Sequence, residues 1–498
     1  MRILDYRLEA EALSLEQELV SWRNWIYGDN PQFAQTYEGH ERLFSRATLD
    51  TVKKAIENEP NPREKKSLRY FHNHLLLQQV GKEVAPLEDE KLQKETAAEI
   101  RVDNEWFPYR MAQVMLAQEE DYERRATIYR AITPILTESL NPLLFEKETT
   151  SRQICRDLGF DSYNTVAETY RNANLDSLGK LAESFLATTQ ELYLRWLGEI
   201  VGELMGFPLE KFRVCDISRL LKSPQFDAFF PKEKLVSTLR EVLEGLGIDL
   251  REQTNLRIHD APLEKKNPRA VCFPLKVPED IRLSVKPVGG HLDYESLFHE
   301  MGHGQHFANT RTTVWEFQHL GDNTITETYA FLMEGMLDHA ALLEKRFNVP
   351  DDARRSYLRF KAFAKLFMVR RYCAKLLYET AFHAGQVEGK ELYGKLLARA
   401  YGFAVGDESA ERYLNDMDDF FYSADYLRAW LLEAQLETAL ENNFGHEWFA
   451  NPKAGDFLRE LWAYGTELGC DELIEWLGFV ALTPDALLMQ IANRVGDT

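Results

Sequence analysis

The sequence predicts a mostly α-helical protein, one large helical body with two lobes and a small β-sheet edge. Apolar residues recur at three- and four-residue steps over most of the chain, which is the period of helices with one buried face. The 27 glycines and 18 prolines among 498 residues are too few for an all-β chain. With 45% hydrophobic residues, the chain can bury a large core.

The predicted helices begin close to the N-terminus. The first covers residues 8–25 and ends at the break Asp29-Asn30-Pro31. Charged helical patterns dominate before Asn141-Pro142, so we predict an N-terminal helical lobe at residues 1–145 and a second helical region at 146–498 with the candidate site. Further amphipathic runs cover residues 64–80, 88–118, 121–140, 176–205, 232–246 and 352 nearly to the end.

One segment departs from the helical period. Residues 270–277 and 281–285 are rich in β-formers and partly alternate, which predicts two strands of a small sheet. Pro287 and the pair Gly289-Gly290 end the second strand. A new helical pattern follows, and Asp293 is its predicted N-cap.

Charge and cysteine usage exclude several classes of function. Against 59 Lys and Arg stand 80 Asp and Glu, a formal net charge of −21, which repels nucleic acid and anionic lipid. No apolar run approaches the ~18 residues of a membrane span, and the start of the chain lacks the apolar region of a signal peptide. The five dispersed cysteines predict reduced thiols and a cytoplasmic location.

Residues 298–303 read FHEMGH and contain the pattern HExxH. On a helix, positions four apart have Cβ atoms about 5–6 Å apart, so His299 and His303 can each give a ring nitrogen to one Zn²⁺. Glu300 lies about 100° round the helix from His299, where it can take a proton from a metal-bound water. The alternative is a solvated helix with histidines facing water, but the preceding strand and Gly-Gly turn favour a metal site. Co²⁺ or Mn²⁺ would also suit such ligands.

The next helical pattern, residues 324–334, offers a third ligand. Glu327 lies 24 residues after His303, and Glu334 lies two turns further on the same helical face. We predict that Glu327 coordinates the metal and that Glu334 orients a ligating imidazole. Thr324 and Glu327 also have the spacing of a capping box, in which Glu327 would only close the helix start.

Other polar and aromatic residues near these patterns have two interpretations. His306 and His291 could contact a substrate or pack on the helix, and His319 is more typical of a loop residue. Tyr422 and Tyr426 lie four apart, so their phenols could donate hydrogen bonds to an oxyanion or a substrate carbonyl. Alternatively, these aromatic rings pack between helices.

Four stretches together resemble the gluzincin peptidases of the thimet oligopeptidase and oligoendopeptidase family. This family is related in fold to angiotensin-converting enzyme and to bacterial and archaeal HExxH carboxypeptidases. The stretches are LGFDSY at 158–163, FHEMGHGQH at 298–306, Glu327 with Glu334, and Tyr422-x-x-x-Tyr426. The resemblance covers about the last 350 residues of the chain.

The resemblance implies an almost entirely helical, two-lobed fold with a deep channel between the lobes. A sheet edge in such a channel pairs with the peptide backbone, and residues 281–285 are the candidate edge. The family's third tyrosine falls at Ala429, and the histidine five residues before the tyrosines falls at Met417. Either another donor replaces them, namely Tyr422, Tyr426, Arg428 or a loop histidine, or cleavage is slower, or the alignment is shifted locally.

The resemblance implies a zinc-dependent metallopeptidase that hydrolyses peptide bonds in short oligopeptides through a metal-activated water. His299, His303 and Glu327 would hold one zinc ion, with Glu300 as general base and acid. Tyr422 or Tyr426 would steady the substrate or oxyanion. The expected partners are small peptides, with no nucleic acid and no membrane. The aromatic residues, 12% of the chain, could serve a homodimer or the channel.

Three alternatives stay open at this point. The length of 498 residues is closer to the carboxypeptidases, whereas residues 326–329 (TETY) depart from the HESQS-like sequence of that group. Loss of the third tyrosine also allows a catalytically degenerate peptide-binding protein on the same fold. Zinc-dependent hydrolysis of a non-peptide bond would use the same site.

Overall fold

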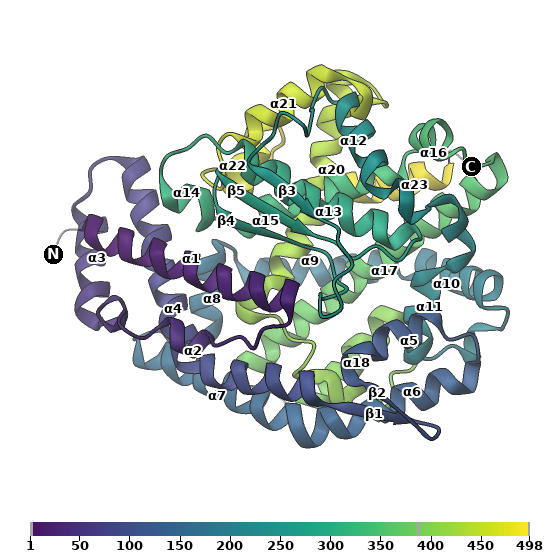
Figure 1. Ribbon diagram of the computed structural model, residues 1–498, viewed down its shortest axis with the longest axis horizontal. Helices are drawn as coiled ribbons and strands as arrows, with labels where there is room; N and C mark the ends of the chain where they lie inside the picture. The colour runs from purple at the N-terminus through teal and green to yellow at the C-terminus, as the bar shows by residue number, and fades with distance from the viewer. Residues whose placement is uncertain (1–2, 386–388, 497–498) are drawn as a thin grey trace.

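The computed structural model describes residues 3–385 and 389–496 and shows a mostly helical molecule with two small sheets (Figure 1), which confirms the predicted fold class. The first half of the chain carries α1 (Ile3–Tyr27), α2 (Phe33–Thr36), α3 (Arg46–Asn58), α4 (Pro62–Ala97), α5 (Ala112–Gln118), α6 (Tyr122–Pro134), α7 (Asn141–Asp157), α8 (Tyr163–Arg171), α9 (Leu175–Thr188), α10 (Gln190–Met205), α11 (Ile217–Lys222) and α12 (Leu235–Gly245).

The second half begins with the helices that carry the candidate site. They are α13 (His291–Asn309), α14 (Trp315–His319), α15 (Asn323–Gly335), α16 (Ala340–Phe347), α17 (Asp351–His383), α18 (Gly389–Tyr401), α19 (Asp407–Ala410), α20 (Tyr422–Phe444), α21 (Pro452–Trp462), α22 (Cys470–Trp476) and α23 (Asp485–Gly496).

The prediction of one helix over residues 88–118 is wrong, because a β-hairpin interrupts the helical structure at residues 99–108. α4 runs through Pro86 to Ala97, and a hairpin of β1 (Glu99–Val102) and β2 (Glu105–Pro108) follows before α5. Ile100 and Val102 point into the core while their neighbours are exposed, and Asp103 makes the turn with a φ of 58°. Four residues of alternation are too short to stand out against the surrounding helical pattern.

The predicted lobe boundary near Asn141-Pro142 lies within a continuous helical stretch. α6 passes through a π-helical turn, η3 (Ile135–Leu140), directly into α7. Pro142 is accommodated in the first turn of α7, where its missing N–H would have no intrahelical partner. Residues on both sides of this point belong to one hydrophobic core that includes Leu136 and Phe363.

The second sheet contains both predicted strands and one that was not predicted. β4 (Val271–Lys276) pairs antiparallel with β5 (Asp280–Ser284), and β3 (Leu256–His259) pairs parallel with β5 on its other side. The order β3-β5-β4 makes β5 the central strand, so residues 281–285 are not the sheet edge. The prediction of that edge is wrong because the third strand lies in a segment whose four residues show no distinctive period.

This sheet is held between helices that reach the site. Phe273 and Leu275 of β4 pack against Trp22 and Ile26 of α1, and Figure 1 shows α1 alongside the sheet. At Gly304 of α13, a Cβ atom would lie 2.9 Å from Leu283 in β5, so α13 approaches the sheet closely. No helix among residues 3–385 and 389–496 has the length and apolar character to cross a membrane.

Candidate metal centre

α13, α15 and α20 bring the predicted site residues together. α13 and α15 touch backbone to backbone at Gly302, where a Cβ atom would lie 2.4 Å from the carbonyl oxygen of Tyr329 and 2.5 Å from the Cα of Ala330. Only glycine fits this approach, so the glycine inside the HExxH motif sets how close the two helices come. His299 and His303 of α13 therefore face Glu327 of α15.

The side chains of His299, His303 and Glu327 converge. Their ligand atoms all lie within 4.8 Å of one another. His299 Nε2 lies 3.4 Å from Glu327 Oε2, and His303 Nε2 lies 3.7 Å from Glu327 Oε1. Two ligands that each lie about 2.0–2.1 Å from a tetrahedral ion are about 3.3 Å apart, so these separations suit Zn²⁺.

Each of the two imidazoles uses its Nδ1 atom, the ring nitrogen that does not face Glu327, in a hydrogen bond. His299 Nδ1 lies 3.0 Å from Glu334 Oε2, as the sequence predicted for an orienting carboxylate. His303 Nδ1 lies 2.7 Å from Thr326 Oγ1, a contact that no sequence signal indicated. With Nδ1 engaged, each ring presents Nε2 to the space beside Glu327.

Glu327 provides the test of whether a cation fits. It is 3% exposed, and its Oε2 has no hydrogen-bond partner within the described chain. Its Oε1 accepts a hydrogen bond of 2.5 Å from the Tyr422 hydroxyl. A buried carboxylate oxygen without a partner is costly, and coordination of a cation would satisfy it. The capping box with Thr324 does not form, because Asp322 is the N-cap of α15.

Glu327 and the two histidines change one another's pKa values. Burial would raise the pKa of Glu327, yet His303, His299 and Tyr422 hold it below its usual value. Burial would lower the pKa of His299, but the carboxylates of Glu327 and Glu334 hold it well above its usual value. Both shifts favour an ionised Glu327 with positive charge beside it, and a bound cation would supply that charge in place of the His299 proton.

Glu300 lies beside the ligands without joining them. Its charge acts on the pKa values of His299, His303 and Tyr426, which places it among these three residues. Its carboxylate forms neither a hydrogen bond nor an ion pair with any residue that the structure describes. Glu300 is thus a half-buried carboxylate that is free to accept a proton.

The two tyrosines of α20 differ in position. Tyr422 holds Glu327, whereas Tyr426 lines a cavity of about 330 Å³ next to Phe331, whose ring contacts His299. Burial raises the pKa of the Tyr426 hydroxyl far above its usual value, so it stays a hydrogen-bond donor. Ala429 is completely buried, so the position expected for a third tyrosine lies inside the core.

Arg428 is not a candidate to replace the third tyrosine. Its guanidinium binds both carboxylate oxygens of Asp322 at 2.9 Å and Asp425 at 2.8 Å, all of them buried. It therefore fixes the start of α15 to α20. Arg171 pairs with Asp425 as well and lies over the Tyr422 ring.

The remaining histidines lie outside the ligand set. His306 is fully buried against Tyr329, and burial lowers its pKa to about 4, so it is a neutral packing residue. His291 bridges Glu295 and the carbonyl of Lys222 at 2.6 and 2.8 Å. His319 ends α14 and lines a different cavity.

The sequence predicted Asp293 as the N-cap of α13, but Asp293 belongs to the first turn of that helix. The helix begins at His291 after Gly290, and Asp293 Oδ2 accepts the backbone N–H groups of Val288 and Gly289 at 2.6 Å each. The prediction was wrong by three positions because the carboxylate reaches back to the turn instead of forward along the helix.

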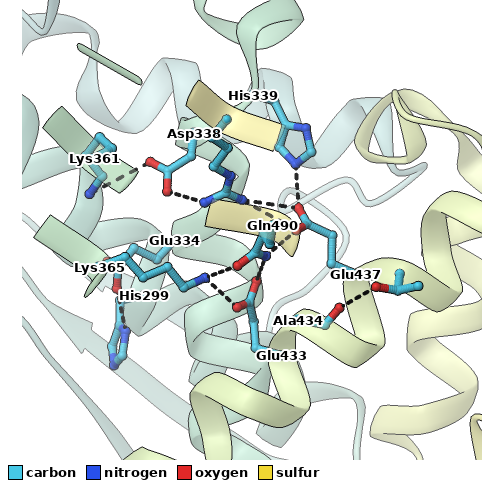
Figure 2. Close-up of polar contacts among 12 residues, drawn as sticks. His299, Glu334, Asp338, His339, Lys361, Lys365, Glu433, Ala434, Glu437 and Gln490 are labelled. Carbon is cyan, nitrogen blue, oxygen red and sulfur yellow. Dashed lines mark hydrogen bonds and ion pairs between the residues drawn. The ribbon is translucent and has the colours of Figure 1, made fainter. Parts of the chain in front are cut away.

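A second group of buried charges, which we call the ionic cluster, joins α17, α20 and α23 to Asp338. Lys365 Nζ donates to Glu433 at 2.6 Å, and Arg494 donates to Asp338 at 2.6 Å and lies 3.4 Å from Glu437 (Figure 2). The cluster consists of Asp338, Lys365, Glu433, Glu437, Gln490 and Arg494. Each of its carboxylates has a cationic partner.

Comparison with known proteins identifies the fold. No family model matches the chain, and no curated protein matches its sequence. A 3.1 Å X-ray structure assigned as oligoendopeptidase F shares 15% identity and a TM-score of 0.77, covering 99% of this chain and 91% of that one. A second oligoendopeptidase F assignment, from Bacillus anthracis str. Ames, gives 14% identity and a TM-score of 0.73 over 97% and 88%.

A third solved structure, PZ peptidase A with an inhibitor, shares 14% identity with a TM-score of 0.75 over 97% of this chain and 90% of that one. At these identities the likeness shows the fold. The chain has the oligoendopeptidase fold over nearly its whole length, whereas the resemblance in the sequence predicted this fold from about the last 350 residues.

Proposed function

We propose that the chain is a zinc-dependent metallopeptidase that hydrolyses peptide bonds in short oligopeptides. The observation that carries the proposal is the convergence of His299, His303 and Glu327, whose buried Oε2 has no hydrogen-bond partner in the described chain. The fold that the chain shares with oligoendopeptidases supports a peptide as the substrate. One zinc ion at these ligands would polarise a substrate carbonyl and acidify a bound water.

The protein side chains then divide the remaining tasks. The Glu300 carboxylate takes the proton of the attacking water and passes it to the leaving amine. Tyr426, from the adjoining cavity, donates its hydroxyl to the oxygen that gains charge in the tetrahedral intermediate. Tyr422 keeps Glu327 in place, so the two tyrosines have separate roles. Glu334 and Thr326 keep the imidazoles oriented.

The peptide backbone has a place to bind on β4. This strand is at the edge of its sheet, so one side of its backbone is not paired with another strand. Cys272 of β4 lies within the electrostatic influence of Glu300, which places the strand beside the site. An extended peptide that adds to this edge would pass its carbonyls in front of the proposed zinc.

Cleavage within a peptide is favoured over removal of C-terminal residues. A carboxypeptidase needs a cation that can bind the substrate's terminal carboxylate. The two lysines that line the adjoining cavity are already paired, Lys361 with Glu295 at 2.8 Å and Lys365 with Glu433 at 2.6 Å. Most of the other residues that line this cavity are aromatic or aliphatic, which suits a large apolar side chain next to the scissile bond.

The proposal includes a cytoplasmic location and no nucleic-acid partner. All five cysteines are free thiols, which suits a reducing compartment, and the net charge of −21 opposes phosphate backbones. The homodimer stays a prediction from the aromatic content.

The test is mass spectrometry of a mixed peptide library incubated with the zinc-loaded protein and with the Glu300→Gln variant. Cleavage by the native sequence alone, at internal bonds, is the expected result. Loss of single residues from C-termini would instead indicate a carboxypeptidase. Absence of cleavage by both proteins, with one zinc per chain measured in each, would refute the peptidase and leave a peptide-binding protein or a non-peptide hydrolase.

A further inference from the structure

A second cavity, of about 260 Å³, lies between α1, α14 and the end of β4. It contains none of the proposed metal ligands, and the mechanism above uses none of its side chains. α1 contributes Glu11, Ser14 and Glu18 to its wall, and Lys276 of β4 also lines it. Positions three and seven residues after Glu11 fall on the same helical face, so these three side chains form one polar row.

The polar row lacks partners. Ser14 Oγ is fully buried and has no hydrogen-bond partner among the residues that the structure describes. The carboxylates of Glu11 and Glu18 form neither a hydrogen bond nor an ion pair with any residue in 3–385 or 389–496. Two carboxylates and a hydroxyl that face one cavity without partners indicate that something outside the chain satisfies them.

The surroundings supply little positive charge. Burial lowers the pKa of His74 and of His319 to about 4, so both imidazoles are neutral near pH 7. Lys276 is exposed, and it forms no ion pair with any residue that the structure describes. Burial raises the pKa of Glu18 to about 7, with no charge or hydrogen bond to offset the cost. A cation bound beside Glu18 would stabilise its ionised form.

The cavity lies within reach of a peptide at the proposed active site. Burial raises the pKa of the Cys272 thiol, and the charges of Glu300 and Glu18 raise it further, so this β4 residue lies near both carboxylates. From Cys272 to Lys276 an extended strand advances about 13 Å, or four residues. A peptide lying along β4 would therefore bring a group three or four residues from its scissile bond to the cavity.

We propose that this cavity binds an ammonium group of the peptide substrate, with Glu18 as the main counter-ion and Glu11 and Ser14 as further acceptors. An ammonium offers three N–H donors, which matches three unpartnered acceptors in one row. The group is either the free N-terminus of the peptide or a lysine side chain. The inference rests on the proposed function for the identity of the ligand as a peptide.

The test measures binding, so that it is independent of catalysis. Four peptides with a C-terminal fluorophore are titrated into the zinc-loaded Glu300→Gln protein: one with a free N-terminus, one N-acetylated, one N-acetylated with a single lysine, and one N-acetylated with norleucine in its place. At least one ammonium-bearing peptide is expected to bind about tenfold more tightly than its neutral counterpart. The first pair reports the N-terminus and the second reports the lysine.

The same titrations with Glu18→Gln added are expected to remove that difference. Glu16→Gln, an exposed position of the same helix, makes the same charge change and is expected to preserve it. Equal affinities within both pairs, or a difference that survives Glu18→Gln, would overturn the inference. Cleavage by the protein with native Glu300 is measured separately, so failure of the peptidase proposal is distinguishable from failure of the ammonium site.

Discussion

The metal centre and the ionic cluster are two groups of buried carboxylates, and they differ in how their charges are satisfied. In the cluster, Glu433 and Asp338 each have a cationic partner at 2.6 Å. In the metal centre, Glu327 contacts imidazoles and a phenol, and its Oε2 has no hydrogen-bond partner in the described part of the chain. A buried polar group that is satisfied indicates structure, and one that is not indicates a ligand.

Removing one charged partner at each place should therefore affect different properties: metal binding at the metal centre and stability in the ionic cluster. Glu327→Gln is expected to abolish tight zinc binding and, with it, hydrolysis. The chelator-treated protein should unfold at the same temperature as the chelator-treated native sequence, or higher, because an unsatisfied buried charge is gone. Metal analysis and thermal unfolding measure the two effects. Retention of one zinc per chain by this variant would remove Glu327 from the ligand set.

A substitution in the ionic cluster should lower the free energy of unfolding and leave zinc binding unchanged. Arg494→Met removes the cation closest to Asp338 and the guanidinium beside Glu437, and breaking a buried pair in this way costs about 3–5 kcal/mol. Denaturant unfolding measures the loss, while zinc content is expected to stay at one per chain. Arg355→Met, which removes an exposed partner of Asp352, is the matched control and should change stability by less than about 1 kcal/mol. A loss no larger than in the control would contradict the structural role.

Within the metal centre, Tyr422 and Tyr426 are expected to have separate roles, one in zinc binding and one in catalysis. Tyr426→Phe removes the proposed oxyanion donor and should lower kcat by about 10²–10³-fold with zinc affinity unchanged. Tyr422→Phe removes the hydrogen bond to Glu327 and should weaken zinc binding. Peptide hydrolysis at saturating zinc separates the two effects. If Tyr422→Phe alone lowered kcat under those conditions, the assignment of the two roles would be reversed.

The smallest expected effect concerns the support of one imidazole. Thr326→Val keeps the side-chain shape but removes the hydroxyl at His303 Nδ1, which should weaken zinc binding by about 10-fold. Thr328→Val is the control, because the Thr328 hydroxyl donates to the carbonyl of Thr324 and not to a histidine. Competition with a zinc-buffering chelator measures both. Equal affinities in the two variants would show that the Thr326 contact does not tune the site.

The predictions from sequence succeeded where the pattern is local. The spacing of His299 and His303 needs only one helix, and the strands near residues 270–285 show a short alternating period. They failed where a partner segment decides the outcome. Residues 281–285 became the central strand through β3, and the hairpin at 99–108 is stabilised by burial of Ile100 and Val102 in a core built from distant helices.

The sequence by itself determined the mostly helical class, the HExxH helix and the choice of Glu327 and Glu334 as the acidic residues to examine. Helical periodicity and four-residue spacing are properties of a single segment, so they can be read without knowing its neighbours. Only the tertiary structure decided that Glu327 meets the two imidazoles at 3.4 and 3.7 Å, through the close approach at Gly302.

The tertiary structure also decided which polar residues have partners. Nothing in the pattern of α1 distinguishes Glu18 from Glu16, because both are glutamates on one amphipathic helix. The fold turns one into a cavity beside β4 and leaves the other in water. Burial and pairing depend on which distant segments come together, and a single sequence does not record those contacts.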